Sequence, residues 1–361
     1  MFKHLKFAAI ALLAGAAFTA CSDDDPQPLP TPQAGEQGAY VINQGNQYGG
    51  VAGTVTAVSF NPWQAGTADA FAAANSQSLG DTPQAPHRYG SRIYIPVYGS
   101  NRLWVLDAQT LRIIKAIDTN EPEAVCSGEG YVFVANNDGY VTRIDTATYA
   151  QTRVAVGPNP ASLAYADGQV FVSISDGYNY ANGYANGKKV AVVSASQATL
   201  LRNVTTGTNP GQIVATPKGT LFLVARGNYA DEAARIQTFS ANDAAARDLC
   251  PGQLIALSPK ADRLYVIDYT ADYASNTSTV SSSAYATATL QRVASWQLDA
   301  AHLPAMPQAI DVNPANGDLY VCSDDGPNGY ASLGFVLVYN AQGTWQHTLN
   351  AGIHPFGVAF K

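Results

Sequence analysis

The amino-acid sequence predicts an all-β protein, a seven-bladed β-propeller in which the C-terminal strand closes the first blade. Three observations predict this fold. A proline-led motif returns at a spacing of about 38 to 56 residues. Each repeat contains a series of short alternating strands separated by tight turns. One further proline-led strand stands alone at the end of the sequence. Repeats of this length built from antiparallel strands are typical of propeller blades, and an array of β-sandwiches is the weaker alternative.

Each repeat starts at a proline followed by a short apolar run. The first repeat opens with Gly80–Ala85 and continues into the strands Arg92–Val97 and Leu103–Asp107. Proline lacks a backbone N–H, so the first residue of a strand tolerates it well. We expect a proline to begin the innermost strand of each four-stranded blade. No segment after residue 20 has sustained helical periodicity. The seven prolines are Pro83, Pro122, Pro160, Pro210, Pro251, Pro307 and Pro355.

The first blade is expected to be shared between the two ends of the domain. Tyr40–Asn43 and Thr54–Phe60 have strand patterns with no proline-led motif before them, whereas Pro355–Lys361 is a proline-led strand on its own. Pairing the last strand with the first would close the ring and remove an open sheet edge. The predicted domain therefore covers residues 38–361.

The first 20 residues are typical of a signal peptide, because Lys3 and Lys6 precede an apolar run, Phe7–Ala20, that is short for a membrane span. The segment Phe18–Cys21 resembles a bacterial lipobox, which implies that Cys21 is lipidated. The alternative is an ordinary secreted protein with a chance cysteine.

Residues 21–37 are expected to form the lipidated start and a flexible tether. Ser22–Asp25 resembles the acidic signal that exports lipoproteins of Bacteroidota to the cell surface, and the alternative is a solvated run of charge. Pro, Gln and Gly dominate residues 26–37, a composition that cannot bury a core. The expected location is the outer leaflet of the bacterial outer membrane, through Cys21.

Composition argues against one class of partner, and the pairing of the cysteines stays undecided. The 361 residues carry 13% charged side chains and a net charge of -7, and no basic stripe is present, which argues against nucleic-acid binding. Cys126, Cys250 and Cys322 form either one disulfide and a free thiol or three small buried side chains.

The long connections predict a binding face. In an antiparallel blade, the connection between the second and third strands and the connection to the next blade emerge on the same face. In this chain each blade contributes at least one Tyr and one Asn or Asp to that face. Rigid aromatic rings beside adaptable amides suit a large, partly apolar ligand, although turn-forming and surface-tolerant residues explain each single loop equally well. The candidate ligand contacts are Asn46, Tyr48, Tyr98, Asn101, Asn137, Tyr178, Tyr180, Arg226, Tyr229, Tyr269, Asp324, His354 and Phe356.

Catalytic and metal signals are weak. HExxH, CxxC, GxSxG and phosphate-loop motifs are missing from the sequence, so we expect a non-catalytic protein. His87 and His354, at the starts of first strands, could act as a general base, but a structural role is favoured for each. Asp324-Asp325 and Asn136–Asp138 could offer oxygen ligands to Ca²⁺, although neither is a complete calcium loop, and metal binding stays open.

Three segments carry a family resemblance. Tyr40–Asn46, Leu79–Asp81 and Leu103–Asp107 together resemble the YncE-like, YVTN-repeat propeller lipoproteins of Bacteroidota. Within that group, the overall layout is most similar to surface lipoproteins that capture cobamides, vitamin B12 and its relatives, and pass them to a TonB-dependent outer-membrane transporter. The resemblance implies a cobamide bound across the loop face, with the propeller as a lid on the transporter.

Two alternative functions come from other classes. Seven-bladed propellers also include lyases and hydrolases, which would use His87 or His354 with a nearby carboxylate. The chain could also be a surface module that binds another polypeptide, although its hydrophilic loops argue against an exposed apolar patch.

Overall fold

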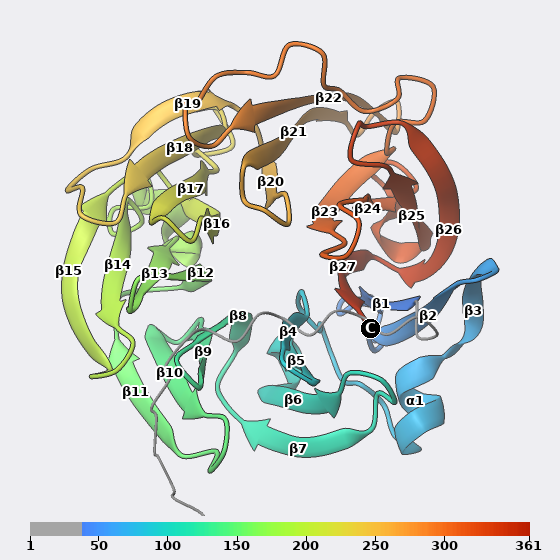
Figure 1. Ribbon diagram of the computed structural model, residues 1–361, viewed down its shortest axis with the longest axis horizontal. Helices are drawn as coiled ribbons and strands as arrows, with labels where there is room; N and C mark the ends of the chain where they lie inside the picture. The colour runs from blue at the N-terminus through green and yellow to red at the C-terminus, as the bar shows by residue number, and fades with distance from the viewer. Residues whose placement is uncertain (1–37) are drawn as a thin grey trace, which may run out of the picture. The chain divides into compact units, whose positions relative to one another are not determined.

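The computed structural model describes residues 38–361. The predicted signal peptide, the acidic signal, the tether and Cys21 lie outside the described residues. Seven small antiparallel sheets are arranged around a common axis, as Figure 1 shows, so the predicted seven-bladed propeller is confirmed. No helix within residues 38–361 is long and apolar enough to cross a membrane.

The blades are numbered here in chain order, and each is described from the axis outward. The C-terminal strand β27 (Pro355–Phe360) joins blade 1 as its innermost strand and pairs with β1 (Gly38–Asn43), so the predicted closure is also confirmed. The remaining strands of blades 1 to 4 are β2 (Thr54–Phe60) and β3 (Trp63–Asp69) in blade 1; β4 (His87–Tyr89), β5 (Arg92–Val97), β6 (Arg102–Asp107) and β7 (Ile113–Asp118) in blade 2; β8 (Pro122–Gly128), β9 (Tyr131–Asn136), β10 (Tyr140–Asp145) and β11 (Gln151–Ala155) in blade 3; and β12 (Pro160–Ala166), β13 (Gln169–Ile174), β14 (Lys189–Ser194) and β15 (Thr199–Thr205) in blade 4.

The other three blades complete the ring. Their strands are β16 (Pro210–Ala215), β17 (Thr220–Ala225), β18 (Arg235–Ser240) and β19 (Arg247–Pro251) in blade 5; β20 (Leu254–Leu257), β21 (Arg263–Asp272) and β22 (Thr277–Ala286) in blade 6; and β23 (Met306–Val312), β24 (Leu319–Asp324), β25 (Leu333–Tyr339) and β26 (Trp345–Ile353) in blade 7. The short helices are α1 (Ala70–Asn75), η1 (Tyr98–Ser100), η2 (Gly177–Asn182) and η3 (Gly329–Ala331).

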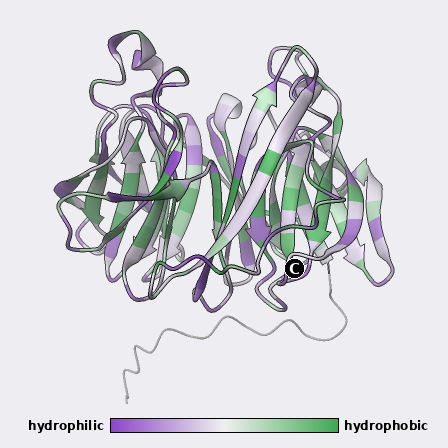
Figure 2. Ribbon diagram, turned by 90° about the horizontal axis from the view of Figure 1, so that it is seen from above, coloured by the Kyte–Doolittle hydropathy of each residue, from purple (hydrophilic) through white to green (hydrophobic). Residues whose placement is uncertain are grey.

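The hydrophobic core lies between blades. Seven apolar clusters occur among the described residues, one at each interface of neighbouring blades. Tyr94 and Val105 of blade 2, for example, pack with Val132 and Val134 of blade 3. Because both faces of a middle strand are covered by neighbours, these strands are buried along almost their whole length, whereas the outermost strands stay largely exposed. Figure 2 shows the apolar strands between hydrophilic loops.

Side chains connect the innermost strands, which belong to separate sheets. Ser162 Oγ accepts a hydrogen bond from the N–H of Ile213 at 3.4 Å, linking blades 4 and 5. Gln212 likewise accepts a hydrogen bond from a backbone N–H of the next blade. Asp311 does the same, because its Oδ2 accepts a hydrogen bond from the N–H of Val358 at 2.8 Å. Backbone N–H groups at the axis, which lack a sheet partner, are thereby satisfied.

The prolines occupy the predicted position in most blades. Pro122, Pro160, Pro210 and Pro355 each begin an innermost strand, and Pro307 is the second residue of β23. In blade 2, Pro83 makes only an isolated bridge ahead of β4. The prediction for Pro251 is wrong, because this residue ends the outermost strand β19. An edge strand also tolerates proline, since one side of it needs no ladder hydrogen bond.

One further expectation is wrong. Blade 6 has three strands instead of four. In place of a fourth strand, the chain after β22 makes scattered contacts, such as the hydrogen bond from the N–H of Val293 to the carbonyl of Ala284 at 2.8 Å. The helix α1 has only six residues, too few to show sustained helical periodicity in the sequence. Asp69 caps it by accepting from the N–H of Phe71, which is fully buried against Trp104.

Candidate functional site

The loop face lies on the side of the ring away from the C-terminus (Figure 2). It carries the connections between second and third strands together with the connections between blades. On this face the candidate residues fall into three clusters, which together draw on all seven blades. Hydrogen bonds and ring contacts join the first two clusters, and electrostatic interactions connect the members of the third.

The first cluster joins blades 2, 3 and 4 through a hydrogen-bonded triad. The hydroxyl groups of Tyr98, in η1, and Tyr178, in η2, lie 2.6 Å apart. Asn137 Nδ2 donates to both, at 3.2 Å to Tyr98 and 3.0 Å to Tyr178. Burial and the hydrogen bond with Tyr178 raise the pKa of Tyr98, so the phenol stays protonated at neutral pH. Tyr178 is still 68% exposed, so its ring is available to a ligand.

The second cluster joins blades 7 and 1 around a buried carboxylate. Asp324, the last residue of β24, is 1% exposed. Its Oδ2 accepts from Gln308 Nε2 at 2.9 Å and contacts His354 Nδ1 at 2.8 Å. Its Oδ1 is buried without a hydrogen-bond partner among the described residues. The His354 ring stacks on Phe356, with ring centroids 5.9 Å apart.

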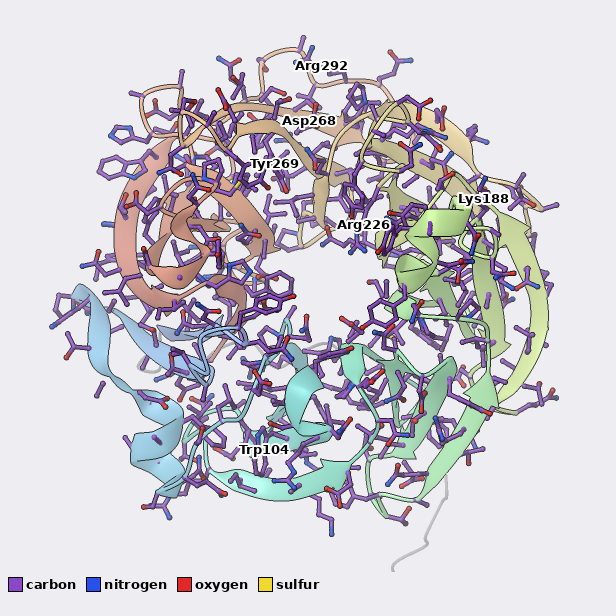
Figure 3. The ribbon with its side chains drawn as sticks, turned by 180° about the vertical axis from the view of Figure 1, so that it is seen from behind. Trp104, Lys188, Arg226, Asp268, Tyr269 and Arg292 are labelled. Carbon is purple, nitrogen blue, oxygen red and sulfur yellow. The ribbon has the colours of Figure 1, made fainter. Side chains whose placement is uncertain are left out.

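The third cluster joins blades 5 and 6 and reaches toward blade 3. Arg226 lies at the inner edge of its blade, with Tyr269 on the neighbouring blade (Figure 3). Burial, reinforced by electrostatic interactions with Tyr273 and Tyr229, raises the pKa of Tyr269. The guanidinium of Arg226 has no hydrogen-bond or ion-pair partner among residues 38–361.

Glu123 faces the third cluster from the innermost strand of blade 3. Burial raises its pKa to about 7, although the charge of Arg226 acts in the opposite direction. Glu123 belongs to blade 3 and Arg226 to blade 5. Because blade 4 lies between these two blades, their charge interaction passes across the ring near its axis. Neither side chain makes a hydrogen bond or an ion pair with a residue between 38 and 361, so each has groups that can bind a polar group of a ligand.

A backbone pattern around the prolines positions these side chains. The residue before the proline is left-handed in five blades, with φ of 55° at Thr82, 40° at Glu121, 50° at Asn159, 53° at Asn209 and 54° at His354. In most blades the residue after the proline is bulged out of the ladder, as at Glu123 and Gln308. A bulge re-aims a side chain. Sequence reasoning missed both residues, although their fixed position after the proline was a usable signal.

Four predicted residues stand apart from the clusters. Asn46 and Asn101 serve local structure: Asn46 Oδ1 accepts from the N–H of Gly49, and Asn101 Oδ1 accepts from the N–H of Glu121. Tyr48 and Tyr180 are 96% and 71% exposed on their loops. Neither of these two side chains touches a cluster residue through a hydrogen bond or ring contact.

His87 lies away from the loop-face clusters. Its Nε2 is hydrogen-bonded to Ser127 Oγ at 2.8 Å. Burial lowers its pKa to about 4, so the ring is neutral at physiological pH. These contacts are those of a structural histidine.

The cysteines and the carboxylates give no metal centre or disulfide within the described residues. Cys126 and Cys322 are buried free thiols, and Cys250 is a partly buried free thiol. The alternative of three small buried side chains therefore describes them better than the alternative of one disulfide and a free thiol. No group of three or more His, Cys, Asp or Glu side chains between residues 38 and 361 is arranged to hold a metal ion. Asp138, one of the residues considered for Ca²⁺, pairs instead with Arg153 at 2.5 Å.

Comparison with known families adds one assignment. The family described as "Domain of unknown function (DUF5074)" matches residues 37–350. The chain belongs to this family. A search of curated proteins finds no significant match.

Solved structures share the fold of this DUF5074 protein at low sequence identity. A quinonprotein alcohol dehydrogenase-like protein from Bacteroides thetaiotaomicron is 15% identical, with a TM-score of 0.63 over 90% of this chain and 78% of that one. A functionally unknown protein from Desulfotomaculum acetoxidans is 11% identical, with a TM-score of 0.64 over 90% and 98%. Kuenenia stuttgartiensis hydrazine synthase is 15% identical, with a TM-score of 0.57 over 71% and 76%.

Proposed function

We propose that this protein is a surface lipoprotein, anchored through Cys21, that captures a cobamide such as vitamin B12 on its loop face and passes it to a TonB-dependent outer-membrane transporter. The observation that supports the proposal is the convergence of aromatic, amide and charged side chains from all seven blades on one face. Bonds across blades, such as the triad of Tyr98, Asn137 and Tyr178, hold these side chains in place before any ligand arrives.

The chemistry of the face suits such a ligand. A corrin ring is a wide, nearly flat macrocycle edged with amides, which needs flat apolar contacts and many hydrogen bonds. Tyr178 and Tyr229 are 68% and 72% exposed and offer ring faces. Arg226 and Glu123 offer polar groups without a hydrogen-bond or ion-pair partner inside the described chain. Pre-organised side chains reduce the conformational entropy lost on binding, which favours tight capture.

Calorimetric titration of the full chain with cyanocobalamin tests the proposal. We expect a dissociation constant in the nanomolar range or lower, about -12 kcal/mol in free energy. Tyr178→Ala and Tyr229→Ala should each weaken binding about tenfold, because an anchoring aromatic side chain contributes at least ~1.4 kcal/mol. Tyr131→Ala is the matched control, since Tyr131 begins β9 at the opposite end of its blade. Titration without heat at high ligand concentration would refute the proposal.

An enzyme is the second candidate function. One observation favours it: His354 has a carboxylate neighbour, Asp324, at 2.8 Å, the arrangement expected of a general base in a propeller lyase or hydrolase. Turnover of a glycan or ester substrate that His354→Asn abolishes would support this candidate. Corrinoid binding without any turnover would exclude it in favour of capture.

A further inference from the structure

We propose that His354 binds the metal at the centre of a captured corrinoid through Nε2, as an axial ligand. This inference rests on the proposed capture function and adds the group that recognises the metal. The side chains that carry it are His354, Asp324 and Gln308, at the junction of blades 7 and 1.

The hydrogen bonds around Asp324 fix the tautomer of a neutral His354 imidazole. Oδ2 of Asp324 already accepts from the amide of Gln308 at 2.9 Å. The same oxygen lies 2.8 Å from His354 Nδ1, so Nδ1 is the donor in that contact. In a neutral imidazole the other nitrogen, Nε2, then carries a lone pair. Metal-binding histidines have this arrangement, in which a carboxylate orients the ring and raises its basicity.

The lone pair of Nε2 is free to bind a ligand. Nε2 makes no hydrogen bond within residues 38–361, and the side chain of His354 is 20% exposed, whereas that of Asp324 is 2% exposed. The carboxylate is therefore a buried support and the imidazole is its accessible end. Phe356, stacked on the ring, limits its rotation.

The other described histidines do not share these properties. Nε2 of His87 is occupied by Ser127. His347 stacks on Trp63, with ring centroids 4.3 Å apart. His302 has a carboxylate neighbour, Asp299, but at 3.4 Å, and it stacks on Trp345 beside the outermost strand of blade 7.

The left-handed backbone at His354 is a common feature of the ring and not a peculiarity of this site. Asn159 and Asn209 take the same position before a proline with φ of 50° and 53°. Asparagine tolerates this conformation well. His354→Asn should therefore keep the fold while removing the imidazole, which makes it the variant of choice.

The proposed step is a ligand exchange without redox change. In aquocobalamin a water molecule occupies one axial position of Co(III). The Nε2 lone pair forms a Co–N bond, the Co–O bond breaks, and the water leaves with its own electron pair. In cyanocobalamin the strongly bound cyanide holds that position, so this corrinoid should bind only through the other contacts of the loop face.

The experiment follows the visible absorption spectrum of each corrinoid as the full chain is added, together with calorimetric affinities. We expect wild-type protein to shift the spectrum of aquocobalamin toward that of a nitrogen-ligated form, leaving cyanocobalamin unchanged. His354→Asn should abolish the shift and any preference for aquocobalamin. Asp324→Asn, at a positioning residue, should weaken aquocobalamin binding about 10- to 100-fold with a smaller effect on cyanocobalamin. His302→Ala is the matched control and should keep the shift.

The outcomes separate this inference from the proposed function. If both corrinoids bind and His354→Asn leaves the spectrum of bound aquocobalamin unchanged, the axial-ligand inference is overturned and capture stands. If neither corrinoid binds, both are overturned.

Discussion

Replacing Asp311 with asparagine should remove a loss of folding stability that the wild-type protein suffers as pH rises. Asp311 lies on β23, the innermost strand of blade 7, and accepts a hydrogen bond from the N–H of Val358. Burial, which outweighs this hydrogen bond, raises the pKa of its carboxyl group from 3.8 to about 7. The folded protein therefore favours the protonated form.

The sign and size follow from proton linkage. Below the unfolded pKa of 3.8 both states are protonated and the stabilising effect is complete. Between that value and about 7 the unfolded chain ionises while the folded chain holds its proton, so stability falls as pH rises. Three pKa units correspond to a loss of at most about 4 kcal/mol above neutral pH.

Asparagine keeps an oxygen that can accept from Val358 but does not ionise. Urea unfolding at about pH 4.5 and about pH 8 should show the free energy of unfolding of Asp311→Asn rising relative to wild type by up to about 3 kcal/mol between these two pH values. Asp107→Asn is the control. The hydrogen bond from Thr110 lowers the pKa of Asp107. The contribution of Asp107 to the pH dependence of folding stability therefore lies below about pH 4. A constant difference between Asp311→Asn and wild type across this range would refute the reasoning.

Three further predictions concern the hydrophobic core, the closing strand β27 and the loop face. Trp104→Phe removes the buried hydrogen bond from Nε1 to the carbonyl of Leu79, 2.7 Å long, and should lower the free energy of urea unfolding by about 1–3 kcal/mol; an unchanged midpoint would contradict this. Deleting residues 355–361 leaves β1 with an open edge and should broaden thermal unfolding and promote aggregation, read by calorimetry and light scattering. Asn137→Leu breaks two hydrogen bonds to phenols and should weaken cyanocobalamin binding several-fold while shifting the unfolding free energy by about 1–2 kcal/mol.

The ring itself was predictable because a blade is a local object. Each blade is a meander of consecutive strands, so its period is visible in the sequence, and proline marks where most innermost strands begin. The closing strand was also predictable, since an incomplete first repeat and a lone strand after Pro355 complement each other. The position of Pro251 was not predictable, because an edge strand tolerates proline as well as the start of an innermost strand does. The three-stranded blade 6 was not predictable either, because a missing outermost strand leaves little trace in the apolar pattern.

The sequence by itself determined which residue types would gather on the loop face, because alternation of strands and connections assigns every loop to one end of the ring. Only the tertiary structure decided which of them meet. Tyr98 and Tyr178 are 80 positions apart, and Asp324 and His354 are 30 apart, yet each pair shares a hydrogen bond. Such pairings depend on the angle between blades and on how each bulge after a proline aims its side chain. Those quantities are set by packing between blades, which the order of residues along one strand does not encode.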